Sequence, residues 1–297
     1  LTGLQHRWSG HRSLVFGATM MEKGVQRWLV DISQWNPSPH DISLAMSVLP
    51  PHDHYVITRF AKIEDRKRAL VSRLLQYALV HRVLGIPFDE IVIRRTPEGK
   101  PYLVCDRLDL EFPNFNFNVS HHGDLVGIAS EPVCLAGLDI VRCVCPTNEQ
   151  IPEFIQNFFS YFSALEWKAI IDSRSCDEML VQFYRCWSLK EAFGKAIGTG
   201  ITYELGKVEF HHDKWSNIYA KMNGKKLEGW RFWVFDLANG HLASIARGQP
   251  SCATGAYRKT MNQVEFDEET YGVALHIPNS TFVPLTVGQL TEQLLKR

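Results

Sequence analysis

The most constraining feature of this 297-residue sequence is a helix predicted over residues 177–197. With 3.6 residues per turn, Trp187, Glu191 and Lys195 lie on one face of this helix. Lys190 lies beside them, so one carboxylate and two ammonium groups project from one rigid patch that could support chemistry. The same spacing also suits an ordinary solvated Glu–Lys pair, and the helix alone leaves both interpretations open.

Length and composition exclude several classes of protein. The chain is 45% hydrophobic and 22% charged, which is typical of a globular protein with one large domain or two lobes. Its formal net charge of +0 provides no overall field for nucleic acid or an anionic membrane, so we expect neither as a partner. No apolar run approaches the ~18 residues of a membrane span. Seven scattered cysteines without a CxxC pair indicate reduced, intracellular thiols.

Residues 1–21 form a leader with two interpretations. No acidic residue precedes Glu22, and the segment contains arginines and serines, as in an organellar transit peptide. Alternatively, translation starts at Met20 or Met21, and the leader is spurious or disordered. We therefore expect a cytosolic protein, or a mitochondrial or plastid one if the leader is a transit peptide.

The first third of the chain predicts a strand at 25–33, a short helix at 41–48 and a long helix at 62–84. The long helix has an apolar stripe and a natural stop at Gly85. Its other face carries basic residues that we expect to be solvated, although they could meet an anionic partner: Arg66, Lys67, Arg68 and Arg73.

A strand from residue 91 runs into a tight Pro/Gly loop that ends at Pro101. Arg94, Arg95 and Lys100 surround the backbone amides that the turn leaves free. Guanidinium forks, an ammonium group and N–H donors suit a phosphate group. An ordinary exposed hairpin is the alternative.

Residues 115–120 alternate between apolar and polar side chains, as a strand does. Asn116, Asn118 and Ser120 share its polar face, whose end we expect to serve a ligand in a cleft. Ser120 and His121 lie on opposite faces, and the sequence has no G-x-S-x-G elbow, which argues against a serine hydrolase.

Apolar strands are predicted at 125–130 and 133–141, and the second of them contains Asp139. A buried carboxylate is costly unless it is paired or binds a metal, although an Asp hydrogen-bonded to a turn at the strand end is also possible. Asp139 and Glu191 are oxygen ligands of the kind that Mg²⁺ uses, together with water and phosphate.

The rest of the chain alternates helix and strand signals. A capping box at 163–166 opens a helix that ends near residue 172. Residues 251–297 form either an extra strand and a short helix or a partly ordered tail. Between these segments, an antiparallel meander is predicted from strands at 206–210, 218–222, 229–236 and 241–247.

Four segments occur in a fixed order: RTPEGKP at 95–101, FNFNVSH at 115–121, GLDI at 137–140 and WSLKEAFGKAIG at 187–198. Together they closely resemble the 4′-phosphopantetheinyl transferases of the larger, monomeric type. The resemblance implies an α+β fold of two similar lobes, related by a pseudo-twofold axis, each with a small antiparallel sheet packed on a long helix. The expected divisions are a leader (1–21), an N-terminal lobe (22–132), a C-terminal lobe (133–250) and an extension (251–297).

The resemblance also implies an activity and a site. These enzymes use Mg²⁺ to move the phosphopantetheine arm of coenzyme A onto a serine of an apo acyl carrier protein, releasing adenosine 3′,5′-bisphosphate. Carried over by position, Asp139 and Glu191 bind Mg²⁺, and Lys195 contacts the pyrophosphate with Lys190 nearby. The expected catalytic residues are Glu191, Lys195 and Asp139. The remaining expected coenzyme A contacts are Arg59, Arg95, Thr96, Pro97, Glu98, Gly99, Lys100, Asn118, Val119, Ser120 and His121, with His121 the main contact of the 3′-phosphate.

The sequence departs from many bacterial members of the family at one position. Those members carry a second carboxylate two residues after the first, where this chain has Val141, so water would complete the Mg²⁺ shell. Glu191 would then accept the serine proton directly or through water. The alternative to an enzyme is a non-catalytic module that binds coenzyme A or a carrier protein. The sequence leaves open whether the carrier is a fatty-acid synthase, an aminoadipate reductase or an organellar acyl carrier protein.

Overall fold

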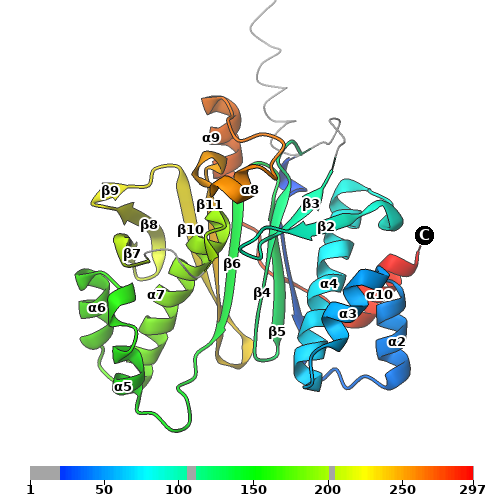
Figure 1. The fold of residues 1–297 in the computed structure, drawn as a ribbon. Coiled ribbons are helices and arrows are strands. Elements are labelled where there is room, and N and C mark those ends of the chain that lie inside the picture. The colour runs from blue at the N-terminus through cyan, green and yellow to red at the C-terminus, as the bar shows by residue number, and fades with distance from the viewer. Residues whose placement is uncertain (1–20, 106–111, 201–204, 297) are drawn as a thin grey trace, which may run out of the picture.

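The computed structural model describes residues 21–105, 112–200 and 205–296, so nearly all of the predicted leader lies outside the described residues. Two lobes stand side by side, each with a sheet facing the centre of the molecule and helices outside it (Figure 1). The prediction of an α+β protein with two similar lobes and small antiparallel sheets is confirmed. No described helix combines the length and apolarity that a membrane crossing requires.

The strands are β1 (Gln26–Asp31), β2 (Val92–Arg95), β3 (Pro101–Val104), β4 (Asn116–His122), β5 (Leu125–Glu131), β6 (Leu135–Arg142), β7 (Val208–Asp213), β8 (Ser216–Met222), β9 (Lys225–Lys226), β10 (Trp230–Leu237), β11 (His241–Gly248) and β12 (Val283–Pro284). The α-helices are α2 (Pro39–Ser47), α3 (Pro51–Thr58), α4 (Ile63–Leu84), α5 (Ile151–Gln156), α6 (Ala164–Ile171), α7 (Cys176–Ile197), α8 (Gly255–Arg258), α9 (Glu268–His276) and α10 (Val287–Leu295).

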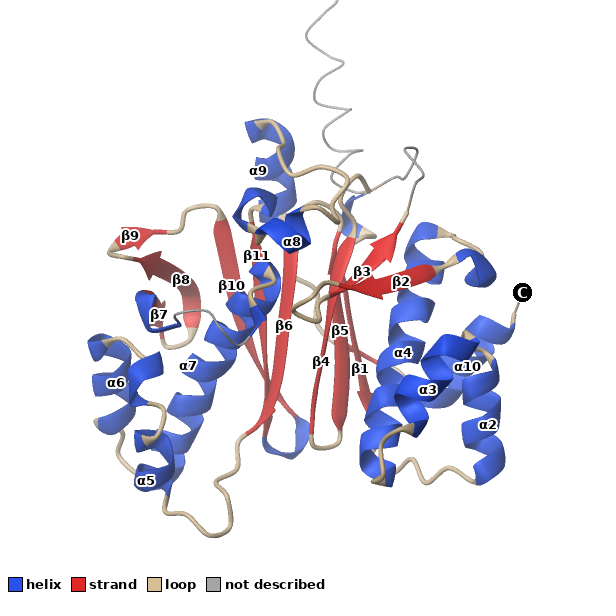
Figure 2. Ribbon diagram, viewed as in Figure 1, coloured by secondary structure: helices blue, strands red, loops and turns tan. Residues whose placement is uncertain are grey.

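The two lobes repeat one topology, which Figure 2 shows as two strand layers flanked by helices. The N-terminal sheet has the order β12-β1-β5-β4 and packs on α4, and the C-terminal sheet has the order β10-β11-β6 and packs on α7. Each long helix has 22 residues and is followed by a glycine with positive φ, Gly85 or Gly198. A residue with a side chain would be strained there, which explains why both helices end at these points.

The basic face of α4 is not wholly solvated, which corrects the sequence prediction. Arg73 is buried because α3 covers it, and Asp53 of α3 lies 3.0 Å from its Nε. Lys67 is also buried and lies 3.2 Å from Glu64, one turn earlier on the helix. The sequence did not predict α3, so it did not predict that Asp53 pairs with Arg73.

The lobes meet where β4 lies beside β6, although these two strands belong to different sheets. Side-chain oxygens of β4 replace the backbone acceptors that a neighbouring strand would offer to β6. The three bonds run from Ala136 N to Asn116 Oδ1 (2.8 Å), Leu138 N to Asn118 Oδ1 (2.9 Å) and Ile140 N to Ser120 Oγ (3.0 Å). We call this set the β4–β6 seam. The polar face predicted for β4 is therefore real, and its main role is to join the lobes.

The predicted meander is divided between two sheets. Strands β7, β8 and β9 form one sheet, and β10 and β11 join β6 in another. All four predicted strands exist, but alternation along a strand does not reveal which sheet it joins. The central C-terminal core fills the space between these sheets and α7 with large apolar side chains such as Phe193, Phe210 and Trp230.

The segment after Pro250 returns from the C-terminal lobe to the N-terminal lobe, as the orange-to-red ribbon in Figure 1 shows. Strand β12 pairs in parallel with β1, and α10 packs on α4. The buried carboxylate of Glu131 lies between Arg27 and Arg247, and Arg247 also donates to the carbonyl of Ile277. This extension is therefore an ordered part of both lobes, with a short strand and helices.

We predict that Asn116→Ala lowers the free energy of unfolding by about 1–3 kcal/mol, because it leaves the buried Ala136 N–H without an acceptor. Urea denaturation measures the change. Asn148→Ala, at an exposed position, is the matched control and should leave the midpoint unchanged. Equal midpoints for both variants would show that the seam does not stabilise the fold.

Candidate active site

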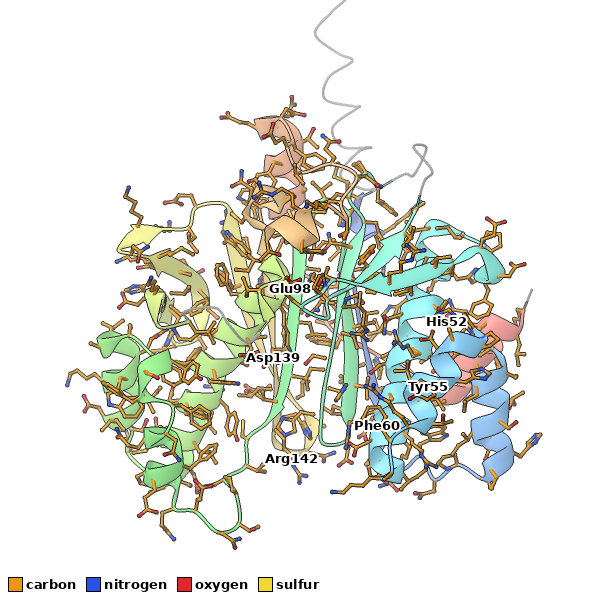
Figure 3. The ribbon with its side chains drawn as sticks, in the orientation of Figure 1. His52, Tyr55, Phe60, Glu98, Asp139 and Arg142 are labelled. Atoms are coloured by element: carbon orange, nitrogen blue, oxygen red, sulfur yellow. The ribbon has the colours of Figure 1, made fainter. Side chains whose placement is uncertain are left out.

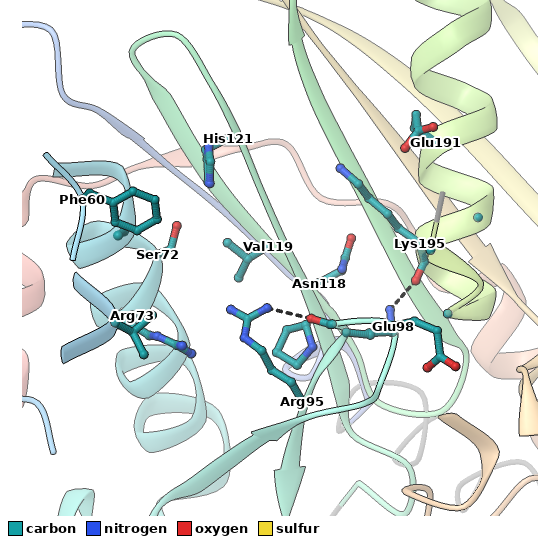
Figure 4. A pocket seen from close by; sticks show the side chains of 18 of the residues that line it. Phe60, Ser72, Arg73, Arg95, Glu98, Asn118, Val119, His121, Glu191 and Lys195 are labelled. Carbon is teal, nitrogen blue, oxygen red and sulfur yellow. Dashed lines mark hydrogen bonds between the residues drawn. The ribbon is translucent and has the colours of Figure 1, made fainter. Parts of the chain in front are cut away.

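A cavity of about 530 Å³ opens between the lobes, within the size range of small-molecule sites. Its walls come from α3, α4, the loop between β2 and β3, β4 and α7 (Figure 4). In Figure 3, Asp139 and Glu98 lie near the centre of the molecule and Phe60 lies on the side of the N-terminal lobe. Most of the sequence-predicted contacts line this cavity: Arg59, Arg95, Glu98, Gly99, Lys100, Asn118, Val119, His121, Lys190, Glu191 and Lys195.

Glu191 and Lys195 line one end of the cavity, which we call the carboxylate end, and Asp139 lies behind Lys195 as its partner. Lys195 Nζ donates to Asp139 Oδ1 at 2.5 Å and to Ser120 Oγ at 3.0 Å. The Asp139 side chain is 7% exposed, and its Oδ2 has no hydrogen-bond partner within the described chain. Burial, followed by the negative charge of Asp139, raises the pKa of Glu191 above its usual value, and Lys195 partly opposes this shift. Two carboxylates therefore repel each other beside one ammonium group.

This end fits a divalent cation. A buried oxygen without a partner and a second carboxylate with a raised pKa would both gain from a positive charge between them. No cluster of three or more His, Cys, Asp and Glu side chains suited to a metal exists among the described residues. Mg²⁺ needs only one or two carboxylates when water and phosphate complete its shell. Val141 is buried and apolar, so it adds no third ligand.

The other end, which we call the arginine end, contains Arg59, Arg73 and Arg95. Arg95 Nη1 donates to the carbonyl of Gly99 at 2.7 Å, and burial followed by the charge of Arg73 lowers its pKa. Arg59 lies over the Phe60 ring, 5.2 Å from the centroid. This end concentrates positive charge that can attract an anionic ligand.

His121, on β4, also lines the cavity. Burial, followed by the charges of Arg68 and Lys195, lowers the pKa of His121 to about 4. The imidazole is therefore neutral near pH 7 in the absence of an anion, and it can still donate one hydrogen bond.

Lys190 does not project with Lys195, which corrects the sequence prediction. Its side chain is 0% exposed, and its ammonium lies 2.9 Å from Glu166 and donates to the carbonyls of Leu205 and Val208. A step of five residues from Lys190 to Lys195 rotates the side chain by about 140°, so the two ammonium groups point in different directions. Lys190 therefore holds the C-terminal lobe together beneath the cavity.

Lys100 also has a role that the sequence did not indicate. Its ammonium donates to the carbonyls of Ala136 at 2.9 Å and Lys195 at 2.6 Å, and it lies 4.7 Å from the ring centroid of Tyr257. Burial, followed by the charge of Lys195, lowers the pKa of Lys100 to about 7. Lys100 therefore ties the N-terminal hairpin to the end of α7.

Four predicted contacts are not among the residues that line the cavity: Thr96, Pro97, Ser120 and Asp139. Thr96 is buried and accepts a hydrogen bond from Lys100 N, so its side chain stabilises the loop between β2 and β3. The sequence reading missed Ser72 and Arg73, which do line the cavity from α4. The basic residues on one face of α4 were the feature of the sequence that could have indicated a contact there.

Comparisons with known proteins identify the family of this chain. A family model described as 4′-phosphopantetheinyl transferase, N-terminal, matches residues 33–133, and one described as 4′-phosphopantetheinyl transferase superfamily matches residues 136–246. The fold and site define a transferase of two lobes with the site between them, and the chain belongs to the 4′-phosphopantetheinyl transferase superfamily. The predicted family resemblance is confirmed.

Named relatives share most of this chain. The L-aminoadipate-semialdehyde dehydrogenase-phosphopantetheinyl transferase of Rattus norvegicus is 35% identical over 232 residues, which cover 75% of each protein. The protein of the same name from Homo sapiens is 34% identical over the same length and coverage. A phosphopantetheinyl transferase of Thraustochytrium sp. is 32% identical over 230 residues, which cover 75% of this chain and 78% of that protein.

We predict that substitution of the two lysines of α7 changes the stability of the protein to different extents. Lys190→Met should lower the free energy of unfolding by about 3–5 kcal/mol, because it leaves the carboxylate of Glu166 buried without its cation. Lys195→Met should lower it by less, because the Lys195 side chain is 31% exposed and lines the open cavity, so water can reach the carboxylate of Asp139 when the lysine is removed. Urea unfolding of both variants checks this, and equal midpoints would contradict the structural role of Lys190.

Proposed function

We propose that this protein transfers the 4′-phosphopantetheine arm of coenzyme A to a serine of an apo carrier protein, in a Mg²⁺-dependent reaction that releases adenosine 3′,5′-bisphosphate. The observation that carries this proposal is the division of one cavity into a carboxylate end, with Lys195, and an arginine end. Coenzyme A carries a pyrophosphate and a separate 3′-phosphate, so its two anionic groups match the two ends.

The reaction is a displacement at phosphorus. The serine oxygen attacks the phosphorus atom next to the pantetheine, the bond from that phosphorus to the bridging oxygen breaks, and the bridging oxygen leaves with the electron pair on adenosine 3′,5′-bisphosphate. Positioning and charge stabilisation dominate the catalysis of such transfers.

The chain itself supplies the proton acceptor and a fixed cation. Glu191, which lines the cavity, accepts the serine proton directly or through water. Lys195 donates to the pyrophosphate oxygens as negative charge develops there, and Asp139 and Ser120 orient its ammonium.

Asp139, through its free Oδ2, and Glu191 are the residues that would hold Mg²⁺. When bound, this ion would neutralise charge on the pyrophosphate. The names of the mammalian relatives lead us to propose a carrier domain of an L-aminoadipate-semialdehyde dehydrogenase as one protein substrate. We further propose that the enzyme acts as a monomer in the cytosol.

Intact-mass spectrometry of an apo carrier protein, incubated with this protein, Mg²⁺ and coenzyme A, tests the transfer directly. The expected result is a gain of about 340 Da, the mass of the phosphopantetheine arm. No gain on several carriers, with coenzyme A still bound, would instead identify a non-catalytic binding module.

Glu191→Ala should slow this transfer at least ~100-fold, because it removes the proton acceptor and one metal ligand. Glu292→Ala, at an exposed position of α10, is the matched control and should retain the wild-type rate. If the Glu191 variant transfers at the wild-type rate, Glu191 is not the base.

Asp139→Asn should raise the Mg²⁺ concentration that gives half-maximal transfer by at least ~10-fold, because an amide oxygen binds Mg²⁺ more weakly than a carboxylate. The measurement is a Mg²⁺ titration of the transfer rate after removal of metal with a chelator. An unchanged Mg²⁺ dependence in this variant would remove Asp139 from the metal site.

A further inference from the structure

Tyr257 lies on the short helix α8, in the extension that follows the part of the chain matched by the family models, which ends at residue 246. Its side chain is buried, and it does not line the cavity. Figure 1 shows α8 next to the end of α7. A buried aromatic ring from outside the matched region therefore packs close to the helix that carries Glu191 and Lys195.

Three contacts place Tyr257 where elements of both lobes meet. Its ring packs on Gly198, where an added Cβ would lie 3.0 Å from the Cβ of Tyr257. Its hydroxyl donates to Oδ1 of Asn116 at 3.3 Å, and this oxygen also accepts from Ala136 N in the β4–β6 seam. The centroid of its ring lies 4.7 Å from the ammonium nitrogen of Lys100. Tyr257 thus contacts the end of α7, the seam and the hairpin of the N-terminal lobe.

The backbone that carries Tyr257 is bound directly to α7. Thr254 N donates to the carbonyl of Ile197 at 2.8 Å, and Thr254 Oγ1 donates to the carbonyl of Gly198 at 3.3 Å. Thr254 is also the N-cap of α8, because its Oγ1 accepts from Tyr257 N at 3.4 Å. These bonds fix the position of the ring relative to the last turn of α7.

The ammonium group of Lys100 is buried without a carboxylate partner among the described residues. An ammonium group has three N–H donors, and Lys100 uses two of them on the backbone carbonyls of Ala136 and Lys195. Its nitrogen lies over the ring of Tyr257. The ring and the two carbonyls are therefore the groups that favour the charged form of this lysine.

The ring acts on Lys100 as a neutral aromatic group. Burial raises the pKa of Tyr257 above its usual value, so the phenol keeps its proton near neutral pH. The negative face of a neutral ring attracts a cation, and the attraction is stronger where water is excluded. Because the neutral amine lacks this attraction, the ring stabilises one protonation state of Lys100 over the other.

The other charged groups near Lys100 do not take this role. The charged side chains on the elements packed around it are Arg95 and Glu98 of its own hairpin, Asp139 of β6, Lys195 of α7 and Arg258 of α8. Burial, followed by the charge of Lys195, lowers the pKa of Lys100 to about 7. Asp139 is paired with Lys195, and Arg258 donates to the carbonyls of Ser251 and Ala253.

The bond from Lys100 to the carbonyl of Lys195 connects this group of contacts with the site. That carbonyl is one of the last four of α7, which have no partner within a helix. A hydrogen bond from a charged donor is stronger than one from a neutral donor, so the charged form of Lys100 holds this turn most firmly. The same turn carries the side chain that donates to Asp139 and Ser120.

We propose that Tyr257 is a positioning residue for the transfer reaction, because it holds the ammonium group of Lys100 and thereby the turn of α7 that carries Lys195. The proposal rests on the proposed function, which gives Lys195 its part in the reaction. It assigns the extension a part in the reaction although Tyr257 does not line the cavity.

The first measurement is an NMR titration of the full chain prepared with isotope-labelled lysine. The Cε resonance of Lys100, identified by its absence in Lys100→Met, reports the loss of the proton. Tyr257→Met replaces the ring with a flexible side chain that fills space, and it should move the midpoint of Lys100 to lower pH by about 0.5–1 unit. Tyr257→Phe keeps the ring without the hydroxyl and should keep the wild-type midpoint.

The second measurement is kcat/KM for coenzyme A as a function of pH, in transfer to an apo carrier protein. This ratio reports the titration of groups in the free enzyme. It should fall as Lys100 loses its proton, so the fall should move to lower pH by about 0.5–1 unit in Tyr257→Met and should not move in Tyr257→Phe. Tyr55→Met, at a tyrosine that is 75% exposed, is the matched control and should keep the wild-type profile.

A second variant covers the case in which Tyr257→Met does not fold. Thr254→Ala removes the cap of α8 and the bond to Gly198 but keeps the ring. It should move the midpoint of Lys100 and the fall of kcat/KM in the same direction by a smaller amount. Urea denaturation shows which variants are folded.

The outcomes separate this proposal from the proposed function. If Tyr257→Met is only less stable or slower at every pH, with both midpoints unchanged, the proposal is overturned and Tyr257 has a packing role alone. An equal shift in Tyr257→Met and Tyr257→Phe would also overturn it, because the hydroxyl would then be the active group. A wild-type chain that never modifies a carrier would overturn the proposed function, and the NMR titration would still decide whether the ring holds Lys100.

Discussion

The β4–β6 seam is the interaction on which the rest of this structure depends. Two sheets, which also share one buried hydrophobic cluster, are held in one alignment because Asn116, Asn118 and Ser120 accept hydrogen bonds from the backbone of β6. Side chains have replaced a ladder of backbone bonds, so the lobes meet in a definite register without merging into one sheet. That register decides which residue of one lobe faces which residue of the other.

The carboxylate end of the cavity follows directly from this register. Ser120 accepts from Ile140 N and from Lys195, and its oxygen lies 3.4 Å from Asp139. An N-terminal-lobe hydroxyl thus organises an acid and a base that both come from the C-terminal lobe. Lys100 also stabilises the alignment of the two lobes, because its ammonium group donates to the backbone carbonyl of Lys195. Ser120, Asp139 and Lys195 therefore reach these positions only when both lobes have formed and are aligned.

Buried charges divide into two kinds according to their partners. Lys190 with Glu166 is fully enclosed and hydrogen-bonded, so it supports the fold. Lys195 with Asp139, and Arg73 with Asp53, each form a contact beside the cavity and leave polar atoms without partners. Unused hydrogen-bonding capacity at a cavity wall is what allows these pairs to bind a ligand. Pairs of a cation and a carboxylate therefore have different roles in different surroundings.

The sequence alone determined the local elements and the family. Apolar periodicity and the glycines at 85 and 198 set the two long helices, alternation set β4, and a carboxylate in an apolar strand marked Asp139. These features act over a few residues, so spacing reveals them. The partners of Arg73, Lys100 and Lys190 come from distant segments, and only tertiary packing brings them together. Tertiary structure therefore decided which cations face the cavity, because a side chain is buried, or paired with an opposite charge, only after the lobes have formed.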